Sequence, residues 1–184
     1  MLSARRPGHE AVLYDGSVRV ALESDLPAVM MLVRDCIEDM KLRGIEQWDE
    51  IYPAHANFSA DVTEGSLYAA FSTGEDLVGV FALNGFQDPE YTEVPWSFLD
   101  ASVGVVHRLM VNPRFQGQGV ARALMVTAER LAVELGFAVL RLDAFSSNPQ
   151  ALRLYRSVGY REAGNVVFRK GRFHCFEKRL RSQD

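Results

Sequence analysis

The chain of 184 residues is long enough for one well-packed core but short for two domains, and 48% of its residues are hydrophobic. No apolar run approaches the ~20 residues of a membrane helix, and the N-terminal segment lacks the apolar centre of a secretory signal, so we expect neither feature. The formal net charge of −4 argues against a nucleic-acid partner, because nucleic-acid-binding proteins are usually basic overall. We expect a mobile tail at residues 1–16 and a single domain at residues 17–184.

The first half of the chain alternates between strand and helix patterns. Ser24 has the character of an N-cap and Pro27 lies in the first turn, and apolar residues at three- and four-residue steps predict a helix that ends at Gly44. The other elements expected here are a strand at 17–22, a loop or broken helix at 44–53, a short helix at 58–64, a hairpin of strands at 67–72 and 77–84, and a polar-aromatic excursion at 85–100.

From residue 101 the order becomes strand, helix, strand, helix, and then two strands. Asn148 is the expected N-cap of the second helix, with Pro149 at its first position and Gly159 at its end. The segments are a strand at 102–111, a helix at 119–136, a strand at 138–144, a helix at 148–159, and strands at 161–168 and 172–180. This order predicts one mixed α/β domain, antiparallel early, with a strand–helix–strand–helix unit late.

Charge and cysteine usage add two expectations. Residues 1–100 contain 6 Lys+Arg and 18 Asp+Glu, whereas residues 101–184 contain 14 and 6. A basic second half suits an anionic ligand, although both halves can also be solvated faces that attract each other across the fold. Cys36 and Cys175 lie in apolar segments, which favours buried thiols over a disulfide and predicts a cytoplasmic location. The four histidines lack ligand spacing, which predicts no metal site.

The segment 114–121, RFQGQGVA, places two glycines one residue apart where a strand passes into a helix. The first turn of a helix has free backbone N–H groups at the positive end of its dipole, so it favours anions. Glycines let a phosphate reach those amides, which here belong to Gln116, Gly117, Gln118, Gly119, Val120 and Ala121. The alternative is a turn that only needs positive φ, for which one glycine would suffice.

Two other phosphate-binding motifs fit this segment less well. A P-loop requires a lysine after its last glycine, and none follows here. The dinucleotide fingerprint requires a small residue where Arg122 stands, although Asp143 imitates its ribose-binding acid. The nicotinamide alternative is therefore the weaker one.

The same segment resembles the R/Q-x-x-G-x-G/A signature of the GNAT superfamily of N-acetyltransferases, with Arg114, Gly117 and Gly119 at its defining positions. The later segment NPQALRLYRSVGY resembles the second family motif, through Asn148, Ala151, Tyr155 and Gly159-Tyr160. The order of elements fits from residue 17 to 180, and the sequence is similar to a bacterial subgroup whose acceptors are unassigned.

The resemblance implies a fold, a cofactor and an assembly. The fold is a mostly antiparallel central sheet with a splayed parallel strand pair, flanked by helices, and the cofactor is acetyl-CoA. Its pyrophosphate is expected on the amides of residues 116–121, beside Arg114, and its pantetheine arm on the main chain of Leu109, Met110 and Val111. Asn148 is expected to cap a helix while contacting the cofactor. Family members are often homodimers, which suggests that assembly here by analogy.

The resemblance also implies a catalytic residue, whereas the acceptor site is argued from residue types. Tyr155 matches the general acid of the family, because a phenol with a pKa near 10 can protonate a leaving thiolate; by spacing alone it is a core aromatic. His107 has a pKa suited to a base but is equally a packed strand residue. The loop acids Glu46, Asp49 and Glu50, beside Trp48 and Tyr52, predict a cationic amine acceptor with an apolar body, unless the acids are solvated and the aromatic residues fill the core. A water relay in place of a single base is also open.

Three functions remain in view from the sequence. The leading one is acetylation of a small-molecule amine by direct attack on the thioester. The alternatives are a peptide or protein N-acetyltransferase and a CoA-binding regulatory module without turnover. Tyr155 favours catalysis over the last of these.

Overall fold

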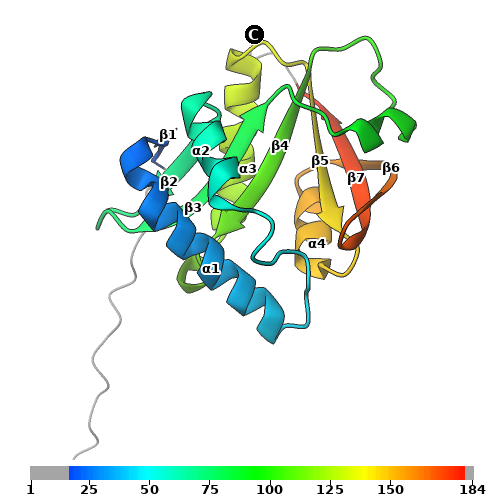
Figure 1. The fold of residues 1–184 in the computed structure, drawn as a ribbon. Helices are drawn as coiled ribbons and strands as arrows, with labels where there is room; N and C mark the ends of the chain where they lie inside the picture. The colour runs from blue at the N-terminus through cyan, green and yellow to red at the C-terminus, as the bar shows by residue number, and fades with distance from the viewer. Residues whose placement is uncertain (1–16, 181–184) are drawn as a thin grey trace, which may run out of the picture.

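A sheet of seven strands runs through the computed structural model, which describes residues 17–180 (Figure 1). Its strands are β1 (Val18–Val20), β2 (Leu67–Phe71), β3 (Leu77–Asn84), β4 (Val103–Val111), β5 (Val139–Phe145), β6 (Arg161–Phe168) and β7 (Gly171–Arg179). In space their order is β1-β2-β3-β4-β5-β7-β6, and every neighbouring pair is antiparallel except β4 and β5, which are parallel. The predicted fold class is confirmed. The tail expected at residues 1–16 lies outside the described residues.

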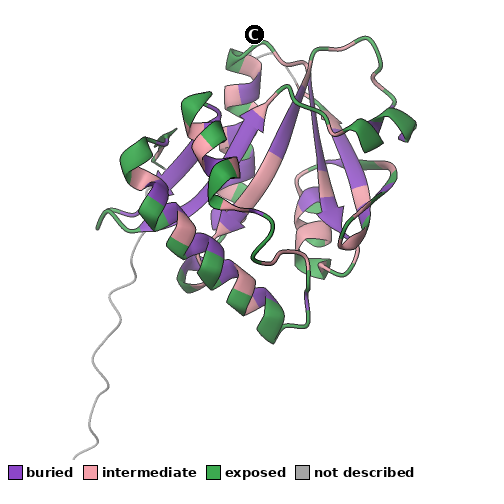
Figure 2. Cartoon of the chain, in the orientation of Figure 1, coloured by how far each residue is buried: buried purple, intermediate pink, exposed green. Residues whose placement is uncertain are grey.

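Helices cover both faces of this sheet. Alternate residues of β3 enter different cores because successive side chains of a strand point to opposite faces: Val80 packs with α1 (Leu26–Leu42) and α2 (His55–Thr63), whereas Phe81 packs with α3 (Val120–Glu134) and α4 (Pro149–Ser157). Short 3₁₀ turns lie at Glu23–Asp25, Pro89–Glu93 and Pro113–Phe115. Figure 2 shows β2, β3 and β5 almost wholly buried between these helices, whereas β4 is only partly buried over His107–Leu109.

Two helix starts differ from the sequence prediction. Ser24 lies inside a 3₁₀ turn, and the residue that precedes α1 is Asp25. The Asp25 carboxylate accepts a hydrogen bond from the backbone N–H of Leu22 at 2.7 Å and pairs with Arg19 on β1, so the polar contacts that secure this turn belong to Asp25. The second helix begins at His55 rather than at Phe58, because its polar first turn carries no apolar periodicity.

The parallel pair β4–β5 is short, and this opens the sheet. The two strands are in register only from Val103 opposite Val139 to Val105 opposite Arg141, although β4 continues to Val111. Figure 1 shows them diverging beyond that point. The edge of β4 from Val106 onward therefore has no strand partner on its β5 side, which confirms the predicted splayed pair.

A bulge in β4 lies at the start of this opening. The register of β4 against β3 shifts between Val80 and Ala82, and Arg108 has a φ of 52°. Positive φ at a non-glycine residue costs of order 1–3 kcal/mol and needs outside support. Asp61 on α2 supplies it, because its carboxylate binds the Arg108 guanidinium at 2.9 Å to Nε and 2.6 Å to the terminal nitrogen.

Other features concern thiols, metals and membranes. Cys36 and Cys175 are both buried and unpaired, as favoured from the sequence. Within residues 17–180, no three His, Cys, Asp or Glu side chains are grouped so that they could hold a metal ion. Over the same residues, no helix combines the length and hydropathy that crossing a bilayer requires.

Candidate active site

The turn between β4 and α3 has the backbone geometry of an anion site. Gly117 and Gly119 have φ values of 75° and 82°, so both glycines, and not one, are needed for the turn itself. A Cβ added to either would meet no protein atom within 4 Å, so the space beside them is open. Within the described chain, the backbone N–H groups of Gly119–Arg122 find no protein acceptor, as expected at the start of a helix. Open space and free amides together suit a phosphate.

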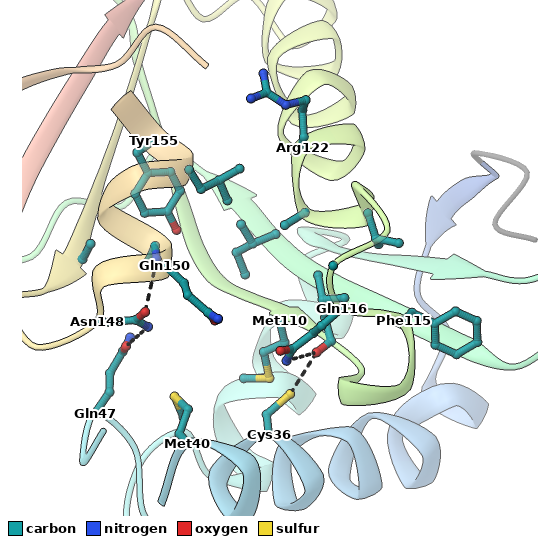
Figure 3. Close-up of a pocket in the computed structure, with 18 of the residues that line it drawn as sticks. Cys36, Met40, Gln47, Met110, Phe115, Gln116, Arg122, Asn148, Gln150 and Tyr155 are labelled. Carbon is teal, nitrogen blue, oxygen red and sulfur yellow. Dashed lines mark hydrogen bonds between the residues drawn. The ribbon is translucent and has the colours of Figure 1, made fainter. Parts of the chain in front are cut away.

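A cavity of about 430 Å³ connects this turn with the open edge of β4 (Figure 3). Nine of the eleven residues predicted to bind the cofactor line it: Leu109, Met110, Val111, Gln116, Gly117, Gly119, Val120, Ala121 and Asn148. Arg114 and Gln118 do not line it, and both are exposed. The structure therefore brings the strand, the turn and the second motif to one cavity.

The side chains of Gln116 and Cys36 both hydrogen-bond to the main chain at the end of β4. The Val111 carbonyl accepts hydrogen bonds from Gln116 Nε2 at 3.2 Å and from Cys36 Sγ at 3.5 Å. Asn148 caps α4, as predicted, by accepting a hydrogen bond from the Ala151 N–H at 3.1 Å. Its Nδ2 donates to Gln47 Oε1 at 3.0 Å, which ties the loop at 44–53 to the start of α4.

A second cavity, of about 360 Å³, shares Gln47, Trp48, Leu109, Asp143 and Tyr155 with the first. The shared residues define a junction between the two cavities. Beyond it, the second cavity is lined by β4, the loop at 44–53 and the turn between β6 and β7. A molecule in each cavity would therefore meet at Tyr155 and Asp143.

Tyr155 is nearly buried but reaches the junction. Its side chain is 7% exposed, and Figure 3 shows the hydroxyl directed into the space between α4 and α1. Within residues 17–180 this hydroxyl has no hydrogen-bond partner, and burial, with the nearby Asp143 carboxylate, raises the pKa of Tyr155 above its usual value. It therefore stays protonated at neutral pH and is free to donate.

Asp143 is the complementary group at the junction. Burial raises the pKa of Asp143 to about 6, although the Tyr91 hydroxyl donates to its Oδ2 at 2.7 Å and opposes that shift. A carboxylate with this pKa is ionised at neutral pH but is a stronger base than an exposed aspartate. The sequence drew attention to Asp143 only as an imitation of a ribose-binding acid.

His107 lines the second cavity but is a weaker base than expected. Its Nε2 lies 3.2 Å from the Phe86 carbonyl oxygen, and because a carbonyl only accepts, this nitrogen carries the proton. Burial, together with the neighbouring Arg108, lowers the pKa of His107 to about 4. The ring is therefore neutral at neutral pH.

The three predicted acceptor residues of the loop at 44–53 have different positions. Trp48 lies at the junction of the cavities. Glu46 is exposed and lines neither cavity. Asp49 is held by the turn after β6, with Oδ1 2.7 Å from Arg169 and Oδ2 3.1 Å from Lys170, and these cations keep the pKa of Asp49 well below its usual range.

Other lining residues carried no functional signal in the sequence. Cys36 and Met40 belong to the apolar face of α1 and are indistinguishable there from core residues. Arg122 was noted only as an obstacle to the dinucleotide motif, yet it lines the first cavity, and its guanidinium binds the Ser157 hydroxyl at 2.8 Å. This contact joins the start of α3 to the end of α4.

Comparison with known proteins agrees with this architecture. Residues 31–160 match the model of the acetyltransferase (GNAT) family. The chain is 29% identical to human N-acetyltransferase 8B over 104 residues, 56% of this chain and 42% of that protein. It is 39% identical to mycothiol acetyltransferase of Acidothermus cellulolyticus over 72 residues, 38% of this chain and 21% of that protein. The chain thus spans less than half the length of either relative.

The fold likeness is more extensive. A GNAT-family acetyltransferase from Streptococcus agalactiae superposes with a TM-score of 0.81 at 20% identity, over 93% of this chain and 99% of that one. At this identity the likeness concerns the fold alone. The family match over residues 31–160 covers more than half of the chain, so the chain belongs to the GNAT acetyltransferase family.

The glycine turn leads to a binding prediction. We expect acetyl-CoA to raise the Tm of the wild type. Replacing Gly119 by leucine places a side chain in the open space before the helix amides and should abolish that rise. Gly136→Leu is the matched control, because Gly136 has a φ of 84° and equally open surroundings but lies outside both cavities. Both variants should lose stability by a similar amount. A normal acetyl-CoA shift in Gly119→Leu would contradict the assignment of the turn.

Proposed function

We propose that this chain transfers the acetyl group of acetyl-CoA to the primary amine of a small molecule, by direct attack of the amine on the thioester. The observation that carries the proposal is the junction, where one cavity that suits the cofactor meets a second that is open to an acceptor at Tyr155 and Asp143. Relatives named N-acetyltransferase and mycothiol acetyltransferase support acetyl transfer as the reaction class.

The first cavity fits acetyl-CoA on three observations. The glycine turn offers open space, the amides of Gly119–Arg122 offer free donors for the pyrophosphate, and the β5-facing edge of β4 lacks a strand partner. Leu109, Met110 and Val111 on that edge would hold the pantetheine arm. Bound acetyl-CoA would supply the acetyl thioester.

The residues at the junction accept and donate the protons that the reaction transfers. Asp143 accepts the proton that the amine loses as its nitrogen forms the new C–N bond. Tyr155 donates its hydroxyl proton to the sulfur as the C–S bond breaks, so that CoA leaves as the thiol. Among the candidate bases, Asp143 is favoured over His107 because its conjugate acid has a pKa of about 6 against about 4.

The second cavity supports a small acceptor rather than a long peptide. Its volume of about 360 Å³ is at the lower end of the range for small-molecule sites. The ion pairs of Asp49 with Arg169 and Lys170 join the loop at 44–53 to the turn after β6. This bridge leaves less room for a polypeptide beside the junction.

The function is tested by following acetyl transfer with mass spectrometry. Wild-type protein and acetyl-CoA are incubated with a panel of small primary amines and, separately, with peptides. We expect acetylated small amines together with release of free CoA. Acetylated peptides alone would favour the peptide N-acetyltransferase. Binding of acetyl-CoA without transfer to either panel would favour a regulatory module and contradict the proposal.

A further inference from the structure

The charges around the second cavity define the class of acceptor, an inference that rests on the proposed function. Two carboxylates lie on its lining: Asp143 at the junction and Asp88 beyond it. Asp143 accepts one hydrogen bond from a neutral tyrosine, and Asp88 has no side-chain hydrogen bond or ion pair within residues 17–180. Neither carboxylate has a cation in direct contact, although Arg108 acts on Asp88 through space, so this side of the cavity suits an ammonium group.

Positive charge is in excess at the turn after β6. Arg169 and Lys170 line the second cavity but not the first, so they lie away from the junction. They share a single carboxylate, that of Asp49, at 2.7 and 3.1 Å. One of the two positive charges therefore has no carboxylate in direct contact, although Glu50 also acts on Arg169 through space. The Arg169 side chain is 47% exposed, which places this charge where an arriving molecule can reach it.

The third cation on the cavity lining, Arg108, is not available to bind a carboxylate. Arg108 is 11% exposed, is bound by both oxygens of Asp61, and donates to the Tyr52 hydroxyl at 3.2 Å. Its guanidinium is thus engaged inside the protein. The free positive charge of the cavity lies on the Arg169–Lys170 turn alone among the lining residues described.

Aromatic side chains line the second cavity between the carboxylates and the Arg169–Lys170 turn. Trp48 lies at the junction, Tyr52 lies on the loop at 44–53, and Phe168 and Phe173 flank the turn with their ring centroids 5.2 Å apart. Such walls favour an apolar or aromatic body and offer no charge of their own.

We infer that the acceptor is an amino-carboxylate with an apolar or aromatic body, such as an amino acid or a short peptide-like compound. Its amine lies at Asp143, its body lies against the aromatic residues, and its carboxylate binds the Arg169–Lys170 turn. Guanidinium groups suit this role because they bind carboxylates with two parallel hydrogen bonds. The inference replaces the purely cationic acceptor expected from the loop acids, because Asp49 is already paired and Glu46 lines neither cavity.

The test compares acceptors that differ only in the negative charge. L-phenylalanine and L-phenylalanyl-glycine are each assayed against their C-terminal amides, with wild type, the double variant Arg169→Ala/Lys170→Ala, and the control Arg130→Ala. Arg130 is 52% exposed in a surface ion pair with Glu134 on α3 and lines neither cavity. The readout is the ratio of kcat/KM for acid over amide, compared between wild type and variant. The different basicities of the two amines affect each protein equally and cancel in this comparison.

We expect the double variant to lower this ratio by about tenfold to a hundredfold, the usual value of a charged hydrogen-bonded contact. Arg130→Ala should leave the ratio unchanged. Turnover of the amides by the double variant shows that it is folded, so an unchanged ratio with active amides overturns the inference while the proposed function stands. Absence of transfer to every amine by wild type, with acetyl-CoA bound, overturns the proposed function instead.

Discussion

Replacing Tyr155 by phenylalanine should lower kcat by about 10²-fold or more while acetyl-CoA affinity stays close to wild type. The variant removes one hydroxyl and keeps a ring that packs against Tyr160 and Phe176. If Tyr155 protonates the leaving thiolate, the loss is that of a general acid, typically 10²- to 10⁴-fold. Steady-state kinetics give kcat, and the shift in Tm with acetyl-CoA gives the binding readout.

Tyr160→Phe is the matched control for this prediction. Tyr160 is also a nearly buried tyrosine, at 3% exposed, but it lines neither cavity. Loss of its hydroxyl should leave kcat near wild type. Equal turnover in the two variants would make Tyr155 a core residue and not a catalytic one.

Replacing Asp143 by asparagine should lower kcat/KM by about 10²- to 10⁴-fold and, at neutral pH, raise stability. Asparagine keeps an oxygen that can accept the Tyr91 hydrogen bond but cannot take up a proton. In the wild type, kcat/KM should fall as pH drops below about 6, because Asp143 becomes protonated there. The residual activity of the variant should lack this acidic limb. Variant activity with the wild-type pH profile would exclude Asp143 as the base.

The stability effect follows from the direction of the pKa shift. Since folding raises the pKa of Asp143 from 3.8 to about 6, the protonated form stabilises the native state below pH 3.8, and this contribution is lost as pH rises through about 6. At pH 7 the ionised, partly buried carboxylate therefore costs up to about 3 kcal/mol. The groups that interact with it are Tyr52, Tyr91, Tyr155, Asp88 and Cys175, none of them a cation. Thermal unfolding at pH 5 and pH 8 should show a larger gain in Tm for Asp143→Asn at the higher pH.

Local sequence signals predicted most of the fold and drew attention to nine residues that the structure places on the lining of the first cavity. Asn148 and Pro149 mark a helix start through contacts within four residues, and the apolar run at 77–84, which follows a turn at 73–76, marks a strand. The glycine turn belongs to the same class, because positive φ at Gly117 and Gly119 is a property of the backbone at those positions. Ser24 was wrong as a helix cap because Arg19, on a neighbouring strand, holds Asp25 instead.

The acceptor side was decided by contacts between distant segments. Asp49 looked like a free acid until the fold brought Arg169, 120 residues away, into contact with it. His107 looked like a base until burial beside Arg108 lowered its pKa.

The sequence by itself determined the family, the sheet-and-helix order and the position of the glycine turn, because each depends on residues close together in the chain. Only the tertiary structure placed Asp143 beside Tyr155 and opened a second cavity between them and the turn after β6. The physical reason is that β4 and β5 pair over three residues and then separate, and no local pattern states where a pairing ends.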